Sequence, residues 1–140
     1  MSCNIVVLYY SRDGNTRRMA NQIARAVTSI DGCSAALRTV PEISIDQSTT
    51  ESTDKTRAPF ISKSDLHDAD GLIVGSPTRF GNMAAPLKYF FDSTSDIWLQ
   101  GVLCDKPAAV FTSSSTMHGG QESTLFTMML PLLHLSLIHI

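Results

Sequence analysis

Hydrophobic runs alternate along the chain with segments of helical period, and this alternation predicts a parallel sheet joined by crossover helices. The first run, residues 5–10, is continuous, β-branched and aromatic, which is typical of a strand covered on both faces. Further strands are predicted over residues 34–40, 71–75 and 107–111. The expected fold class is therefore α/β, a doubly wound parallel sheet with helices on both faces.

The first two predicted helices follow the first two strands. One begins at Thr16 and ends at Asp31-Gly32, and a shorter one with a serine cap occupies residues 64–70. The apolar stripe of the first helix is predicted to comprise Met19, Ile23, Val27 and Ile30. Residues 41–63 are rich in Ser, Thr, Asp and Lys, and we interpret them as a surface excursion.

Two further helices flank the fourth strand. Pro86 fits the first turn of the third helix, where a missing N–H costs nothing, and the fourth helix begins near Gln121. Pro131 is expected to kink or shorten that last helix. The side chains expected on the buried faces of these two helices are Leu87, Phe90, Phe91, Leu125, Met128, Met129 and Leu132.

The last six residues, 135–140, look foreign to the rest of the chain. Their sequence is the one encoded by the end of a common transposase sequencing adapter, although it can also start a fifth strand. We interpret residues 1–134 as an incomplete domain followed by a non-native tail. A doubly wound sheet of this size normally has a fifth strand and a last helix. Both are expected to be missing here, which would leave an apolar face exposed.

Composition narrows the class of partner. The 140 residues suit one domain, and a net charge of −2 gives no electrostatic reason to expect nucleic acid or an anionic membrane. The sequence shows no apolar run long enough to span a bilayer and no recognisable signal peptide. Cys3, Cys33 and Cys104 are far apart and form no C-x-x-C motif. They are expected to be buried or half-buried free thiols in a reducing cytoplasm, and no metal site is predicted.

Candidate chemistry begins in the loop after the first strand. A hydroxyl-rich turn that opens a helix offers backbone N–H groups and the positive end of the helix dipole to a phosphate, although an ordinary capped turn uses the same residues. Neither a Walker A motif nor G-x-G-x-x-G occurs, which disfavours a triphosphate or a Rossmann-bound dinucleotide. A monophosphate such as that of FMN remains. Its predicted ligands are Ser11, Arg12, Asp13, Gly14, Asn15 and Thr16.

Two more polar loops, residues 76–83 and 112–122, follow the third and fourth strands. Ligands of open α/β sheets bind beyond the carboxyl ends of the strands, where we expect all three loops to meet. A planar ring needs backbone donors and a flat wall, which we expect from Thr78, Arg79, Phe80 and Gly81. Phe80 can instead be a core aromatic, and His118 a solvated side chain. Trp98, placed in a loop after the third helix, is either a wall for an aromatic substrate or a core residue.

With these loops the sequence resembles the WrbA family, the Trp repressor-binding-protein-like group of flavodoxin-like NAD(P)H:quinone oxidoreductases. The resemblance covers roughly residues 5–134. The matching segments are Tyr9-Tyr10-Ser11 with Gly14, Ser76-Pro77-Thr78-Arg79-Phe80-Gly81-Asn82-Met83, His118-Gly119-Gly120-Gln121-Glu122 and Pro131-Leu132-Leu133-His134. The resemblance implies a sheet of strand order 2-1-3-4-5 and a homo-oligomer, a dimer or a tetramer, with flavin sites near subunit interfaces.

The resemblance also implies an activity, the FMN-dependent two-electron reduction of a quinone by NADH or NADPH. No residue is expected to act as a covalent catalyst, because the flavin carries the redox chemistry. Tyr10 matches the position that faces the nicotinamide nucleotide, and Trp98 matches a quinone contact. Beyond the residues already given for the phosphate and the ring, the implied flavin contacts are Ser113, Ser114, Ser115, Thr116, Met117, His118, Gly119 and His134.

Other functions remain open at this point. One is a flavodoxin that transfers electrons without NAD(P)H dehydrogenase activity, against which the near-neutral charge and Trp98 argue. Another is a regulatory partner of a transcription factor, for which the sequence encodes no recognisable surface. A third is a chain too incomplete to hold flavin. The sequence does not choose between NADH and NADPH, because no reader of the ribose phosphate is identifiable.

Overall fold

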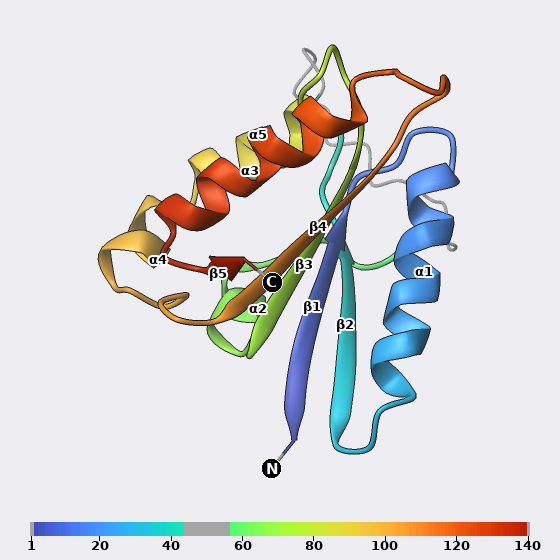
Figure 1. Ribbon diagram of the computed structural model, residues 1–140. Helices are drawn as coiled ribbons and strands as arrows, with labels where there is room; N and C mark the ends of the chain where they lie inside the picture. The colour runs from blue at the N-terminus through green and yellow to red at the C-terminus, as the bar shows by residue number, and fades with distance from the viewer. Residues whose placement is uncertain (1, 44–56, 140) are drawn as a thin grey trace.

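A five-stranded parallel sheet forms the centre of the computed structural model, which describes residues 2–43 and 57–139 (Figure 1). The strand order is β2-β1-β3-β4-β5, and each strand is parallel to its neighbours. The strands are β1 (Cys3–Tyr9), β2 (Cys33–Thr39), β3 (Gly71–Pro77), β4 (Pro107–Ser113) and β5 (Ile138–His139). The α/β class and the strand order predicted from the sequence are confirmed.

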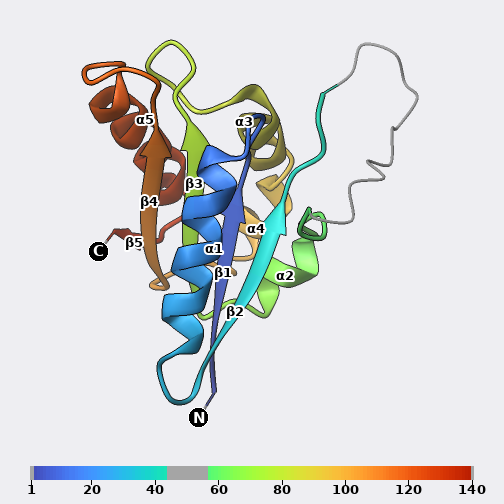
Figure 2. The same cartoon turned by 90° about the vertical axis from the view of Figure 1, so that its right-hand side faces the viewer.

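Helices cover the two faces of the sheet unequally (Figure 2). Among the helices of residues 2–43 and 57–139, four pack against one face and α1 packs against the other. Strand β1 serves both, because Val6 and Leu8 point to the first face whereas Val7 and Tyr9 point toward Ala20 of α1. The helices are α1 (Asn15–Thr28), α2 (Lys63–His67), α3 (Ala85–Asp92), α4 (Ser95–Leu99) and α5 (Gln121–His134).

The buried side of α1 differs from the predicted stripe. Thr16 and Ala20 are buried, whereas Met19 is 38% exposed. Ile30 lies beyond the end of the helix and is exposed as well. The stripe is wrong at these two positions because small side chains, which let the helix lie close to the strands, occupy the contact.

The open part of this face lies at the amino ends of β3 and β4. An apolar hollow of about 190 Å³ lies there, as expected for a sheet whose second face carries one helix. It is lined by Ile5, Gly71, Leu72, Ile73, Pro107, Ala108 and Ala109. Most of these residues are buried or half-buried, and the exposure of an apolar face through a missing last helix stays a prediction.

Two helices, α2 and α5, end or begin at other residues than the sequence predicts. Helix α2 begins at Lys63 and is capped by Ser62, whose hydroxyl accepts a hydrogen bond from the Asp65 N–H while Asp65 accepts one from the Ser62 N–H. The predicted helix began one residue later and ran three residues too far. Helix α5 continues through Pro131 to His134, so the proline does not shorten it. Of the predicted surface excursion, residues 44–56 lie outside the described residues.

The end of the chain corrects a further prediction. A two-residue strand, β5, pairs with Pro107 and Ala108 of β4, so the fifth strand is not missing. Leu135 and Leu137 are buried in the core beside α5. These residues can enter the core because the chain reverses at Ser136, whose φ is 66°. The foreign origin of residues 135–140 stays a prediction.

Candidate functional site

The loops after β1, β3 and β4 meet at the carboxyl edge of the sheet and enclose a polar cavity of about 160 Å³, called here the three-loop cavity. Its lining residues are Ser11, Arg12, Asp13, Asn15, Thr16, Pro77, Thr78, Arg79, Ser113, Ser114 and Ser115. All except Pro77 belong to the predicted flavin ligands. Pro77 ends β3, and its place beside Thr78 in the loop was the signal that could have found it.

The first loop has the geometry of an anion site. Gly14 precedes α1 in a left-handed conformation, with φ 87°, which glycine adopts without strain. The first backbone hydrogen bond of the helix runs from the Arg18 N–H to the Gly14 carbonyl, at 3.0 Å. The N–H groups of Asn15 and Thr16 therefore precede the helical ladder and lie at the positive end of its dipole. Such an end suits a phosphate.

Hydroxyl groups join the first loop to the third. The Thr16 side chain is buried, and its Oγ1 lies 3.0 Å from the Oγ of Ser113. Either hydroxyl can rotate to donate to a ligand oxygen while it keeps the other as a partner. The backbone N–H of Thr78 donates to the Ser113 carbonyl at 3.0 Å, so the second loop is fixed to the same residue.

The second loop turns tightly at its tip. Arg79 and Asn82 exchange backbone hydrogen bonds of 2.8 and 3.0 Å around Phe80 and Gly81, both of which have positive φ, 52° and 75°. The Phe80 ring is fully exposed. Within this chain it is neither a wall of the cavity nor a core aromatic, because the turn directs it into solvent. The interpretation of Phe80 as a core aromatic is therefore wrong, and its role as a wall for a bound ring stays a prediction.

Glycines let the second loop lie against the start of α5. A Cβ added to Gly120 would come within 3.2 Å of the Gly81 Cα, and one added to Gly81 within 2.7 Å of the Ser123 Oγ. The hydroxyl of Thr124 donates to that of Thr78 at 2.7 Å across the same contact. These contacts hold the second loop in place against α5.

The third loop is closed by its own hydrogen bonds. The Ser114 hydroxyl donates to the carbonyl of Thr116 at 2.7 Å, and the side-chain amide of Gln121 donates to the carbonyl of Met117. Met117 and His118 are exposed. The structure places residues 116–119 beside the three-loop cavity but not in its lining.

Tyr10 lies beneath this edge rather than on it. Its side chain is buried in the core, and its backbone N–H donates to the Gly75 carbonyl at 3.0 Å. Burial and the Glu42 carboxylate raise the pKa of its phenol, against the opposing effect of nearby arginines that include Arg79 and Arg12. The phenol is therefore neutral at physiological pH, and two of these three arginines, Arg12 and Arg79, also line the three-loop cavity.

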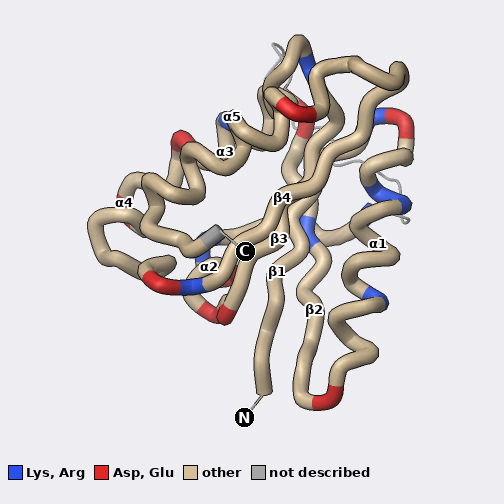
Figure 3. Tube along the Cα trace, viewed as in Figure 1, with Lys and Arg blue, Asp and Glu red and all other residues tan. Residues whose placement is uncertain are grey.

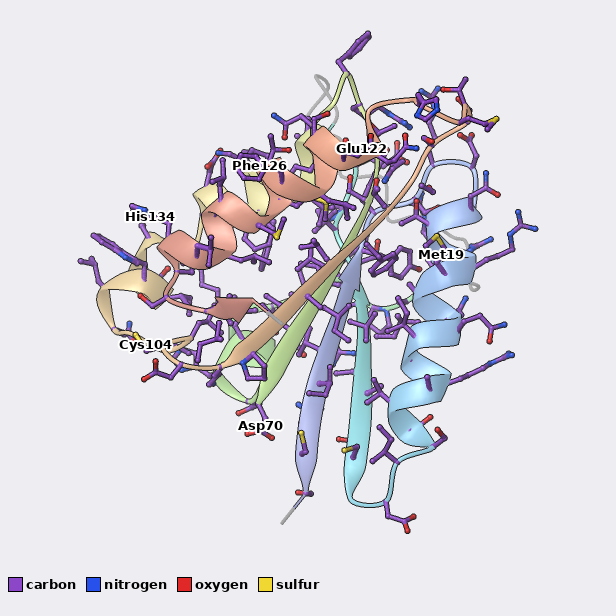
Figure 4. The ribbon with its side chains drawn as sticks, in the orientation of Figure 1. Met19, Asp70, Cys104, Glu122, Phe126 and His134 are labelled. Carbon is purple, nitrogen blue, oxygen red and sulfur yellow. The ribbon has the colours of Figure 1, made fainter. Side chains whose placement is uncertain are left out.

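Trp98 and His134 lie apart from the three-loop cavity. Trp98 belongs to helix α4, not to a loop as predicted, and stacks on the His134 ring with a centroid distance of 5.8 Å and an interplanar angle of 22°. His134 is at the far end of α5 from Glu122 (Figure 4), roughly 20 Å along the helix. The pair borders an apolar groove of about 490 Å³, the α5 groove. The groove is lined by Lys88, Phe91, Asp92, Thr94, Ser95, Trp98, Leu130, Pro131, His134 and Leu135.

The donors of the three-loop cavity fit a phosphate monoester better than a metal ion or a polyanion. They are hydroxyl and backbone N–H groups together with the guanidinium groups of Arg12 and Arg79. Among the described residues no group of three His, Cys, Asp or Glu side chains is arranged to hold a metal ion. Basic and acidic residues are interspersed over the surface (Figure 3). In the part of the chain that the structure describes, no helix has the length and hydropathy of a membrane span.

Comparison with known proteins agrees with this geometry. The sequence profile of a family described as NADPH-dependent FMN reductase matches residues 3–136. A protein of Syntrophobacter fumaroxidans named NAD(P)H dehydrogenase (quinone) is 41% identical over 96% of this chain and 69% of its own length. A quinone oxidoreductase of Triphysaria versicolor is 39% identical over the whole chain and 69% of its own length.

Solved structures give the same result. The WrbA-like flavodoxin of Agrobacterium tumefaciens superposes with a TM-score of 0.75 and 27% identity, over 98% of this chain and 76% of that one. An archaeal flavodoxin, at 18% identity and a TM-score of 0.71, shares the fold. The chain belongs to the NADPH-dependent FMN reductase family and, within it, to the WrbA-like proteins.

Proposed function

We propose that this protein is an FMN-dependent NAD(P)H:quinone oxidoreductase that reduces quinones by two electrons. The observation that carries the proposal is the three-loop cavity, where three loops distant in sequence converge on one phosphate-sized site. Relatives at 38–41% identity that are named NAD(P)H dehydrogenase (quinone) support the same activity. The WrbA-like flavodoxin structure supports the cofactor.

The residues of the three-loop cavity are proposed to hold the cofactor by its phosphate. The N–H groups at the start of α1 and the hydroxyls of Thr16 and Ser113 would donate to phosphate oxygens. Arg12 and Arg79, which line the same cavity, add positive potential. The bound flavin supplies hydride and electron transfer, so the chain needs no covalent catalyst. Residues 78–81 and 113–119 are proposed to orient the ring by backbone dipoles.

Trp98 and His134 are proposed to act on the flavin of another copy of the chain. Their position at the far end of α5 is too distant to reach the cavity of the same chain. A homo-oligomer, a tetramer or a dimer, would bring the α5 groove of one copy to residues 78–81 and 113–119 of another. Tyr10, buried beneath the second loop, is proposed to support the nicotinamide site from below.

Turnover of the flavin-loaded protein tests the activity. Oxidation of NADH and of NADPH is followed at fixed enzyme concentration, with and without benzoquinone, and the flavin absorbance of the purified protein is recorded first. The expected result is quinone-dependent oxidation of at least one of the two nucleotides. Bound flavin without quinone-dependent turnover would instead identify an electron-transfer flavodoxin. Sedimentation of the loaded protein gives the oligomeric state.

A further inference from the structure

Two of the three cysteines lie side by side at the amino edge of the sheet, opposite the three-loop cavity. Cys3 is the first residue of β1 and Cys33 the first residue of β2, and they are partners in the parallel ladder. Ladder partners point to the same face of a sheet. Both side chains are half-buried, and both thiols are free.

The pKa of the Cys3 thiol reflects the neighbouring Cys33. Burial raises the pKa of its thiol most, and the adjacent Cys33 and then Asp70 raise it further. An effect of Cys33 on Cys3 requires the two sulfur atoms to lie close together. Cys104, by contrast, is exposed, and it lies between α4 and β4, two strands away from β1 (Figure 4).

The spacing suits a disulfide. Neighbouring strands lie about 4.8 Å apart, within the range of about 4.4–6.8 Å that Cα atoms of a disulfide span. A disulfide needs Cβ atoms slightly closer than that spacing, and a strand end is where such an adjustment disturbs least. Cys3 begins β1, and its backbone N–H donates to the Gly32 carbonyl at 2.7 Å.

We propose that Cys3 and Cys33 form a reversible disulfide that joins β1 to β2 when the protein meets a peroxide. Hydrogen peroxide oxidises one of the two thiols to a sulfenic acid as its O–O bond breaks and a first water leaves. The other thiol attacks that sulfur, the S–S bond forms and water leaves, so two thiols and one peroxide give a disulfide and two waters. A dithiol reverses the step. The proposal does not depend on the flavin or on the proposed oxidoreductase activity.

The disulfide would enclose the phosphate loop and α1 in a covalent ring. The segment between the two cysteines contains both. A cross-link that restricts such a loop in the unfolded chain stabilises the folded one. The oxidised protein is therefore expected to unfold about 5–10 °C above the reduced protein.

The test compares the protein with Cys104→Ser, which removes only the exposed thiol. Both reduced proteins are treated with hydrogen peroxide, denatured and analysed by thiol titration and peptide mapping. In Cys104→Ser the titre is expected to fall from two thiols to none, and in both proteins a peptide that links Cys3 to Cys33 should appear and vanish with dithiothreitol. The matched variant Cys33→Ser should yield no such peptide and lose the gain in unfolding temperature.

Three results would overturn the proposal. One is an unchanged thiol titre in Cys104→Ser. Another is oxidation of Cys3 and Cys33 to separate sulfinic acids without a cross-link. The third is cross-linking between molecules through Cys104 in the unmodified protein in place of the internal link.

Discussion

The three-loop cavity and the α5 groove lie at opposite ends of one helix and are built by opposite means. Hydrogen bonds tie the cavity together, from Thr16 to Ser113 and from Thr78 to Thr124, and glycines allow its loops to approach. The α5 groove is apolar, and Trp98 stacks on His134 at its border. A polar network is specific for a ligand with matching acceptors, whereas an apolar groove recognises shape and flat rings.

The three-loop cavity and the α5 groove are suited to different ligands. A charged phosphate gains most from fixed donors, since hydrogen bonds to charged groups are the stronger ones. A neutral aromatic substrate gains from an exposed ring such as Trp98, which is 48% exposed. Cofactor affinity should therefore depend on the three-loop cavity, and use of the quinone on the α5 groove. Two substitutions test this division, and a third tests the backbone of the loop beside the cavity.

The largest effect is expected from Thr16→Val. The change keeps the shape of the side chain but removes the hydroxyl that pairs with Ser113 and would donate to the phosphate. Loss of a hydrogen bond to a charged group costs about 1.5–3 kcal/mol, which is roughly a 10- to 100-fold weaker affinity for FMN. Fluorescence titration of FMN into apoprotein measures it. Thr28→Val, at the exposed end of the same helix, is the control, and an equal loss there would refute the assignment.

A smaller effect, on quinone use rather than on FMN affinity, is expected from Trp98→Ala. Loss of aromatic stacking costs about 0.5–1.5 kcal/mol, so kcat/KM for benzoquinone should fall by roughly 3- to 10-fold. Affinity for FMN should fall much less than in Thr16→Val, because the phosphate site is remote from Trp98. Phe126→Ala removes a comparably exposed ring from α5 and is the control. A loss of FMN affinity as large as that of Thr16→Val would abolish the division of tasks.

The smallest effect is expected from Phe80→Gly, at the tip of the second loop. Phe80 has φ 52° and a fully exposed ring, so the substitution relieves backbone strain without uncovering apolar contacts. The gain in unfolding free energy should be about 0.5–1 kcal/mol after the extra entropy of glycine is subtracted. Chemical denaturation of the apoprotein measures it, with Phe80→Ala as the control that keeps the strain. Destabilisation by Phe80→Gly would show that the ring makes contacts in solution, as in an oligomer.

Much of the site could be predicted because the order of the strands in a parallel sheet determines which loops lie side by side. Once residues 5–10, 71–75 and 107–111 are identified as neighbouring strands, their carboxyl ends must meet at one edge. The loop residues that follow, Ser11–Thr16 among them, are then brought together whatever the details of packing. For that reason most of the cavity lining was predictable, with Pro77 the exception.

Side-chain direction was less predictable. The type of turn around Phe80 and Gly81 sends the ring outward, and no periodicity in the sequence encodes that choice. The separation of Trp98 and His134 from the cavity depends on the length and path of α5, which hydrophobic spacing alone does not give. Similarly, Leu135 and Leu137 enter the core because Ser136 reverses the chain.

By itself, the sequence determined the α/β class, the positions of the strands and the polar loops that build a phosphate site, because these follow from local patterns of hydrophobicity and turn chemistry. Only the tertiary structure decided which residues share a surface. It separated Trp98 and His134 from the three-loop cavity and set Cys3 beside Cys33, thirty positions away in the chain. Strand register and helix length fix such distances, and both arise from the packing of the whole domain.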